Sequence, residues 1–211
     1  SPYGGGVRGG LYHSQSVEAL FAHTPGLKVI TPSTPYDAKG LLKSAIRDDD
    51  PVVFLEHKRT YRLVKGEVPD EEYTLPIGRA DIKREGNDIS VITYGLMVHH
   101  CLEAAQAVVN EGIEVEVLDL RTVRPIDNKA IVRTAMKTGK VLIVHEDSKA
   151  LGVGAEVSAI VSEHAFEYLD GPVARLAGPE VPAMPFSPPM EAMYMIDPDK
   201  IATAIRKLAA Y

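Results

Sequence analysis

From Asp88 to the C-terminus, short apolar runs alternate with longer amphipathic stretches, and this alternation constrains the fold more than any other feature of the sequence. The apolar runs have the length and composition of buried strands, and the stretches between them repeat apolar residues at helical spacing. We expect strands at 88–94, 115–120, 140–145 and 173–177, and helices at 98–111, 127–138, 152–168 and 197–208. Because helical crossovers join parallel strands, the pattern predicts an α/β fold with a mostly parallel sheet and helices on both faces.

A less regular stretch precedes this part of the chain. Residues 1–16 are rich in glycine and predict a loop without regular structure. The sequence starts Ser-Pro-Tyr-Gly-Gly-Gly, without an initiator methionine or a signal for a strand or helix, so we expect the chain to begin inside a loop. After it we expect a helix at 16–23 capped by Ser16, a strand at 27–31, a helix at 35–47 that begins after Ser33 or Thr34, and a strand at 51–56.

These patterns divide the chain into two domains. Residues 1–65 are expected to be the C-terminal part of one domain, and residues 88–211 a complete second domain. Between them, residues 66–87 are dominated by charge, Pro and Gly, which is typical of a linker, with local strand pairing expected near 73–77.

Composition excludes several classes of function. The formal net charge is −6 and no basic cluster stands out, which argues against a nucleic-acid partner. No apolar run approaches the ~18–20 residues of a transmembrane helix, so a membrane-spanning role is not expected. Cys101 is the only cysteine and cannot form an internal disulfide, which favours a reducing, cytoplasmic compartment.

Two groups of residues could carry chemistry. His13 ends the glycine-rich segment, outside any apolar periodicity, where an imidazole could transfer protons near neutral pH; a surface histidine without function is equally compatible with the pattern. The acidic turn Asp48–Asp50 follows an expected helix end, whose free carbonyls together with carboxylates could bind a cation. A simple polar turn explains these residues as well.

Long runs of the sequence resemble the β subunit of the thiamine-diphosphate-dependent decarboxylase component of 2-oxo acid dehydrogenase complexes. The YHSQS segment and its YGGGVRGG lead-in are most similar to the branched-chain (3-methyl-2-oxobutanoate) enzymes. The matching runs cover essentially the whole chain: GGLYHSQSVEALFAHTPGLKVITPSTPYDAKGLLKSAIRDDDPVVFLEHK, PIGRADIKREGNDISVITYG, VLDLRTVRPID, KTGKVLIVHED and RLAGPEVPAMPFSP.

The resemblance implies a fold and a function. It implies a transketolase-type C-terminal domain preceded by the C-terminal part of a pyrimidine-binding domain. The expected activity is that of an oxidoreductase with a disulfide acceptor, which decarboxylates a branched-chain 2-oxo acid and passes the acyl group to a lipoyl domain. Alternatives are a pyruvate or acetoin dehydrogenase β subunit, a single-chain transketolase or deoxyxylulose-phosphate synthase, and a non-catalytic domain that docks on the acyltransferase core.

Cofactors and partners are also implied by the resemblance. Thiamine diphosphate and its Mg²⁺ would be held mainly by an α subunit, in a heterotetramer of two α and two β subunits. The main β-subunit contacts to the cofactor, including the family's catalytic glutamate, would lie upstream of Ser1, in an N-terminal third that is expected to be missing; the chain would then need that segment and an α subunit for activity. The location would be the cytoplasm of a bacterium or, in a eukaryote, the mitochondrial matrix.

The same resemblance assigns individual residues. His13 would lie beside the thiazolium ring and act as a general acid toward the lipoyl sulfur. Ala45, Asp48 and Asp50 would help to hold a potassium ion. Asp170 and the terminal carboxylate of Tyr211 would bind the peripheral subunit-binding domain of the acyltransferase.

Overall fold

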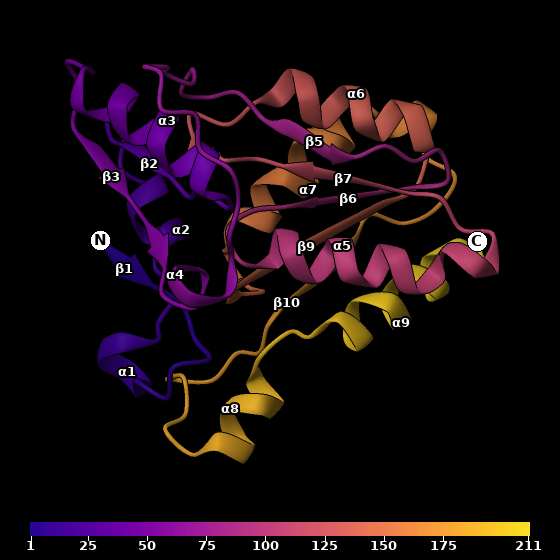
Figure 1. Cartoon of the computed structure of the whole chain (residues 1–211). Coiled ribbons are helices and arrows are strands. Elements are labelled where there is room, and N and C mark those ends of the chain that lie inside the picture. The colour runs from indigo at the N-terminus through magenta and orange to yellow at the C-terminus, as the bar shows by residue number, and fades with distance from the viewer.

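The computed structural model describes all residues, Ser1–Tyr211, and is built around a five-stranded sheet with the order β10-β9-β6-β7-β5 (Figure 1). The four parallel strands and the antiparallel edge strand are β6 (Ile89–Thr93), β7 (Val115–Asp119), β9 (Val141–Ser148), β10 (Ala174–Gly178) and β5 (Asp81–Arg84). Every residue of β6 and β7 is buried, as expected of central strands in a parallel sheet, although Glu116 and Asp119 interrupt the apolar residues of β7.

Helices cover both faces of this sheet, as the alternating pattern predicts. One face carries α5 (Met97–Val108) and α9 (Pro198–Ala209), and the other carries α6 (Asn128–Thr138) and α7 (Val153–His164) (Figure 1). Each pair packs its apolar residues onto the strands as a separate hydrophobic cluster. The predicted α/β class with a mostly parallel sheet is therefore confirmed. None of the helices is both long and apolar enough to cross a membrane.

The first part of the chain adds two small sheets. The strands β2 (Lys28–Ile30) and β3 (Val52–Phe54) are parallel and are joined by α3 (Pro35–Ile46). The Thr34 hydroxyl caps α3, as expected, by accepting the Asp37 N–H at 3.1 Å. The short strands β1 (Pro2–Tyr3) and β4 (Glu56–His57) form a second parallel pair.

One strand connects the two parts of the chain directly. β8 (Thr122–Arg124) follows β7 but pairs antiparallel with β2 of the first part. The sequence does not predict it, because three residues with a partner more than ninety positions away carry no local signal.

The glycine-rich start of the chain is more ordered than the sequence predicts. It contains β1 and a short helix, α1 (Gly10–His13), in place of an irregular loop. Glycines with positive φ, such as Gly4 and Gly6, allow the turns between these elements. The next helix, α2 (Glu18–Ala22), has Val17 at its N-cap, so the expected cap by Ser16 is wrong.

The segment predicted as a linker also differs. β5 lies inside 66–87 and pairs with β7; its charged residues obscure the alternation because it is a half-buried edge strand. No strand forms at 73–77, where the Leu75 N–H instead donates to the Gly40 carbonyl of α3 at 3.2 Å. The sequence also does not predict α4 (Thr60–Leu63) or α8 (Pro188–Tyr194), two short helices in regions rich in turns or proline.

A buried ion network holds α3 of the first part against β5 and β7. The fully buried Asp37 contacts the Arg121 guanidinium at 2.6 Å and the Lys83 ammonium at 2.8 Å. Burial opposes ionisation of Asp37, but hydrogen bonds from Lys83 and Thr34 and the nearby Arg121 charge lower its pKa below the ordinary value. Both cations lie in the C-terminal part of the chain, so this network joins the two parts.

A test of the packing between the linker segment and the second domain uses two N-cap aspartates. Asp127 accepts the Ala130 N–H at 3.1 Å in α6 and also the Ala80 N–H, at 3.1 Å, just before β5. Asp197 caps α9 and bonds only to Lys200 of its own helix. We expect Asp197→Ala to lower the free energy of unfolding by about 1 kcal/mol and Asp127→Ala by about 2 kcal/mol, measured by chemical denaturation. Equal losses would show that the bond to Ala80 contributes nothing.

Candidate functional site

The site forms where the direction of strand addition reverses in the large sheet. The chain passes from β6 to β7 on one side and then to β9 on the other side of β6. The carboxyl ends of β6 and β9 therefore diverge into a crevice of the kind that binds ligands in open α/β sheets. Here residues 4–16, the histidine loop, fill the crevice, and the Tyr3 hydroxyl lies directly against Gly95 after β6.

Glu146, near the end of β9, bonds both ends of the histidine loop. Its buried carboxylate accepts the Gly5 N–H at 2.5 Å and the Ser16 hydroxyl at 3.4 Å, both at Oε1. The other oxygen, Oε2, lies 3.0 Å from Nε2 of the buried His57. Burial raises the pKa of Glu146, but the hydrogen bonds from His57, Gly5 and Ser16 outweigh it and hold the pKa below its ordinary value.

The remainder of the loop is tied down by other groups. The Glu191 carboxylate of α8 accepts the N–H groups of Gly6 and Arg8 at 3.0 and 2.9 Å. The Gln15 side chain accepts the Met184 N–H at 3.0 Å, and its carbonyl accepts the Gly4 N–H at 3.2 Å, which closes the loop on itself. The backbone of the loop is thus fixed although it contains almost no regular structure.

His13 lies at the exposed end of this anchored loop. It is the last residue of α1, and its carbonyl accepts a hydrogen bond from the Lys58 ammonium. The next residue, Ser14, is fully buried and accepts the Gly9 N–H at 2.9 Å. The backbone at His13 is therefore held in place while the imidazole faces solvent, an arrangement suited to proton transfer with a bound partner; its catalytic role stays a prediction.

A second group of buried polar residues lies on the other face of the same strand ends. The Tyr94 hydroxyl donates to the buried Glu18 carboxylate at 2.9 Å, and the Tyr94 ring stacks on His145. Burial and the neighbouring Asp147 raise the pKa of Glu18 to about 8, and burial lowers the pKa of His145 to about 4. Burial thus favours the uncharged form of both Glu18 and His145.

The residues expected to bind potassium lie at the end of α3. The Lys28 ammonium contacts Asp48 at 2.6 Å and Asp50 at 3.0 Å, and the Ala45 carbonyl accepts the Asp48 N–H at 3.4 Å. The hydrogen bond from Lys28 lowers the pKa of Asp48. No three His, Cys, Asp or Glu side chains form a group that could hold a metal ion. A potassium ion would have to share these carboxylates with Lys28, and the site stays a prediction.

The two residues expected to dock the acyltransferase lie close together. Asp170 and Tyr211 are both exposed, and Gly171, next to Asp170, packs against the Tyr211 side chain. The Asp170 N–H donates to the Gly139 carbonyl at 2.8 Å, so the turn that carries its carboxylate is fixed. The docking role itself stays a prediction.

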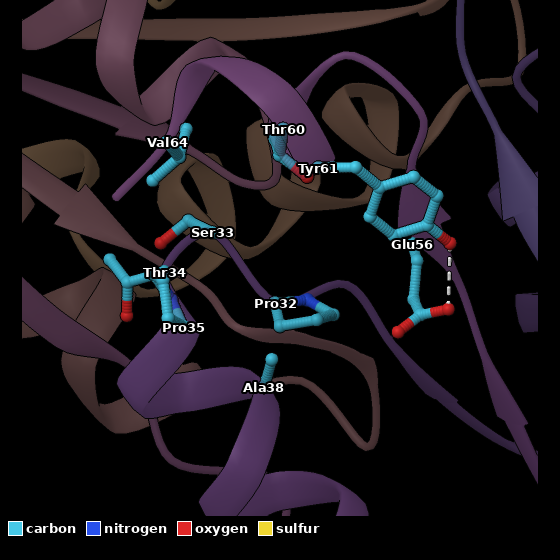
Figure 2. A pocket seen from close by; sticks show the side chains of 9 residues that line it. All are labelled: Pro32, Ser33, Thr34, Pro35, Ala38, Glu56, Thr60, Tyr61 and Val64. Carbon is cyan, nitrogen blue, oxygen red and sulfur yellow. Dashed lines mark hydrogen bonds between the residues drawn. The ribbon is translucent and has the colours of Figure 1, made fainter. Parts of the chain in front are cut away.

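A separate pocket of about 210 Å³ opens where β2 ends, α3 begins and α4 packs (Figure 2). Pro32, Ala38 and Val64 give it apolar surface, and the Tyr61 hydroxyl donates to Glu56 at its rim at 2.8 Å. The predicted site residues do not line this pocket. Its parts lie at three places in the chain, which is why the sequence gives no signal for it.

Comparison with known proteins assigns both parts of the chain. Residues 78–201 match the family model of the transketolase C-terminal domain, and residues 1–64 match that of the transketolase pyrimidine binding domain. Among solved structures, a split-gene transketolase described as an inactive beta4 tetramer aligns with TM-score 0.78 and 26% identity, over 94% of this chain and 62% of that one. Transketolase from Leishmania mexicana aligns with TM-score 0.65 and 18% identity, over 95% and 28%, which shows the fold alone.

Curated relatives confirm the resemblance to 2-oxo acid dehydrogenase β subunits. The 2-oxoisovalerate dehydrogenase subunit beta of Bacillus subtilis (strain 168) is 62% identical over this whole chain and 64% of the relative. The pyruvate dehydrogenase E1 component subunit beta of the same organism is 48% identical over the same shares. The beta subunit of acetoin:2,6-dichlorophenolindophenol oxidoreductase of Cupriavidus necator is 47% identical, over 97% and 60%. The chain thus spans less than two thirds of the length of these relatives.

Two glycines with the same backbone conformation test the packing of the histidine loop. Gly4 and Gly26 have φ of +87° and +86°, but a Cβ on Gly4 would collide with the His57 ring, whereas one on Gly26 would meet nothing within 4 Å. We expect Gly26→Ala to cost about 1–2 kcal/mol of unfolding free energy from backbone strain alone. Gly4→Ala should cost about 1–3 kcal/mol more and should increase protease cleavage within residues 4–16. Equal stability and equal cleavage would show that the loop does not pack on His57.

Proposed function

The chain belongs to the transketolase C-terminal domain family, and we propose that it is part of the β subunit of a branched-chain 2-oxo acid dehydrogenase. The observation that carries this proposal is the 62% identity over its whole length with a 2-oxoisovalerate dehydrogenase β subunit. Identities of 48% and 47% with pyruvate and acetoin enzymes make those substrates the alternative. The activity is that of an oxidoreductase that transfers the acyl product to a lipoyl disulfide.

Thiamine diphosphate is the cofactor that this family implies, and the residues present fit a partial contribution to its site. The exposed imidazole of His13 stands on an anchored loop within the part of the chain that matches the pyrimidine binding domain. When bound, the cofactor supplies the carbon nucleophile for decarboxylation of the 2-oxo acid. We propose that His13 lies at its reactive end, and that the diphosphate and Mg²⁺ are held mainly by the α subunit.

His13 is proposed to act as a general acid during acyl transfer. Cleavage of the lipoyl disulfide releases one sulfur, which leaves more readily as a thiol than as a thiolate. An imidazolium N–H at the exposed end of the loop can donate the required proton, and the fixed backbone limits the search for the correct geometry. Loop anchoring of this kind favours a catalytic chain over a purely docking domain, which would have no use for it.

The proposed partners are an α subunit and the acyltransferase core. We propose a heterotetramer of two α and two β subunits, to which the lipoyl domain delivers its disulfide. The exposed Asp170 and the nearby Tyr211, whose side chain packs against Gly171, would bind the peripheral subunit-binding domain. The bacterial relatives support a bacterial cytoplasm as the location.

Substitution of His13 tests the catalytic proposal. In the assembled dehydrogenase, His13→Asn should leave cofactor affinity nearly unchanged and slow lipoyl acylation by about 10²-fold or more, the usual scale of lost acid catalysis. Decarboxylation followed with an artificial electron acceptor should suffer less, because it needs no proton on sulfur. His23→Asn, at an exposed histidine after α2, is the matched control. An unchanged rate of lipoyl acylation in His13→Asn would refute the assigned role.

Substitution of Asp170 tests the docking proposal. Asp170→Lys should slow association with the isolated peripheral subunit-binding domain and flatten its salt dependence, because reversal adds repulsion to a lost attraction. Asp170→Ala should have the smaller effect expected of an exposed ion pair. Association rates would be measured at two ionic strengths, with decarboxylation of free substrate as the control that must stay normal. An unchanged rate and salt slope would place the docking surface elsewhere.

A further inference from the structure

The histidine loop is a catalytic-site segment whose geometry is set from the other domain. Glu146 lies 141 residues from Gly5 in the sequence, yet its carboxylate bonds the entry of the loop at Gly5 and its exit at Ser16. A carboxylate that accepts a backbone N–H and a hydroxyl in a buried site forms charge-assisted hydrogen bonds, which are stronger than neutral ones. Loss of these bonds would leave the Gly5 N–H and His57 without their buried partner.

Glu191 supplies a second anchor of the same kind. Its carboxylate accepts the N–H groups of Gly6 and Arg8, in a turn where Gly6 and Arg8 both have positive φ. Arg8 is a non-glycine residue in the left-handed region, a conformation that surrounding contacts must enforce. Glu191 is largely buried and stands on α8, so the strained turn before His13 depends on this helix.

From these contacts we propose that Glu146 and Glu191 are positioning residues for His13: they hold the histidine loop so that the imidazole meets its acceptor, without touching substrate themselves. The proposal rests on the proposed function of His13 as a general acid. It assigns the C-terminal domain a part in acyl transfer that is independent of any docking role.

The proposal predicts a specific kinetic pattern in the assembled dehydrogenase. Glu146→Ala and Glu191→Ala should each lower kcat for lipoyl acylation by about 10-fold or more, because small misplacements of a catalytic group are costly, while KM for the lipoyl domain changes less than about 2-fold. Glu146→Gln keeps an oxygen acceptor for the Gly5 N–H and should recover most of the rate.

Combining each glutamate substitution with His13→Asn distinguishes a positioning role from a general loss of stability. If the carboxylates act only through His13, then Glu146→Ala or Glu191→Ala added to His13→Asn should change the acylation rate by less than about 2-fold. Glu116→Ala is the matched control, because Glu116 is a fully buried carboxylate on neighbouring β7 that bonds Thr134 and Lys137, far from the loop. If Glu116→Ala lowers the rate of lipoyl acylation, the fold-decrease should multiply with the fold-decrease caused by His13→Asn.

The outcomes distinguish this proposal from the proposed function. Losses that multiply in the double variants overturn the positioning role while the role of His13 stands. An unchanged acylation rate in Glu191→Ala does the same, and this variant carries the test if Glu146→Ala does not assemble. If His13→Asn itself leaves lipoyl acylation unchanged, the proposed function fails first. The proposal is supported if the losses of acylation rate do not multiply in the double variants and if Glu146→Gln recovers most of the rate.

Discussion

Carboxylates that leave water must find cations or N–H donors, and this requirement joins the two parts of the chain. A buried, unpaired carboxylate would cost several kcal/mol, and two of the buried carboxylates, Asp37 and Glu146, find their partners across the boundary. Asp37 of α3 takes its cations from Lys83 and Arg121 of the second part, and Glu146 of β9 takes its donors from Gly5, Ser16 and His57 of the first. The relative placement of the two parts follows from these pairings.

The same constraint explains why a loop with little regular structure can present a side chain at a fixed position. Glycines at Gly4 and Gly5 let the backbone approach His57, Met184 and Glu146 more closely than any side chain would allow. The close approach brings backbone N–H groups within reach of Glu146 and Glu191, whose bonds replace those of a helix or sheet. Rigidity at His13 therefore arises from distant acceptors, not from local secondary structure.

Elements whose signal lies within a few neighbouring residues are predictable from the sequence, and elements that depend on distant partners are not. β6, β7 and β9 are predictable because burial on both faces enriches them in apolar, mostly β-branched residues, and the Thr34 cap because it acts within one turn. β5 and β8 are edge or joining strands whose partners lie far away in sequence, so their own residues show no period. The glycine-rich surroundings of His13 make it a candidate from sequence, whereas nothing points to Glu146 and Glu191, since 141 and 185 residues separate them from the backbone groups that they bind.

These long-range pairings also decide how the fold can be divided. The crevice at the carboxyl ends of β6 and β9 is where an open α/β sheet ordinarily admits a ligand, but here a loop of the neighbouring domain occupies it. A C-terminal domain separated from that loop would expose Glu146 and its apolar surroundings, Met184 and Met195, to solvent. The loop, in turn, would lose the acceptors that hold its positive-φ residues in place. Because each part supplies the contacts that the other lacks at this crevice, the C-terminal domain and the segment that carries His13 form the site together.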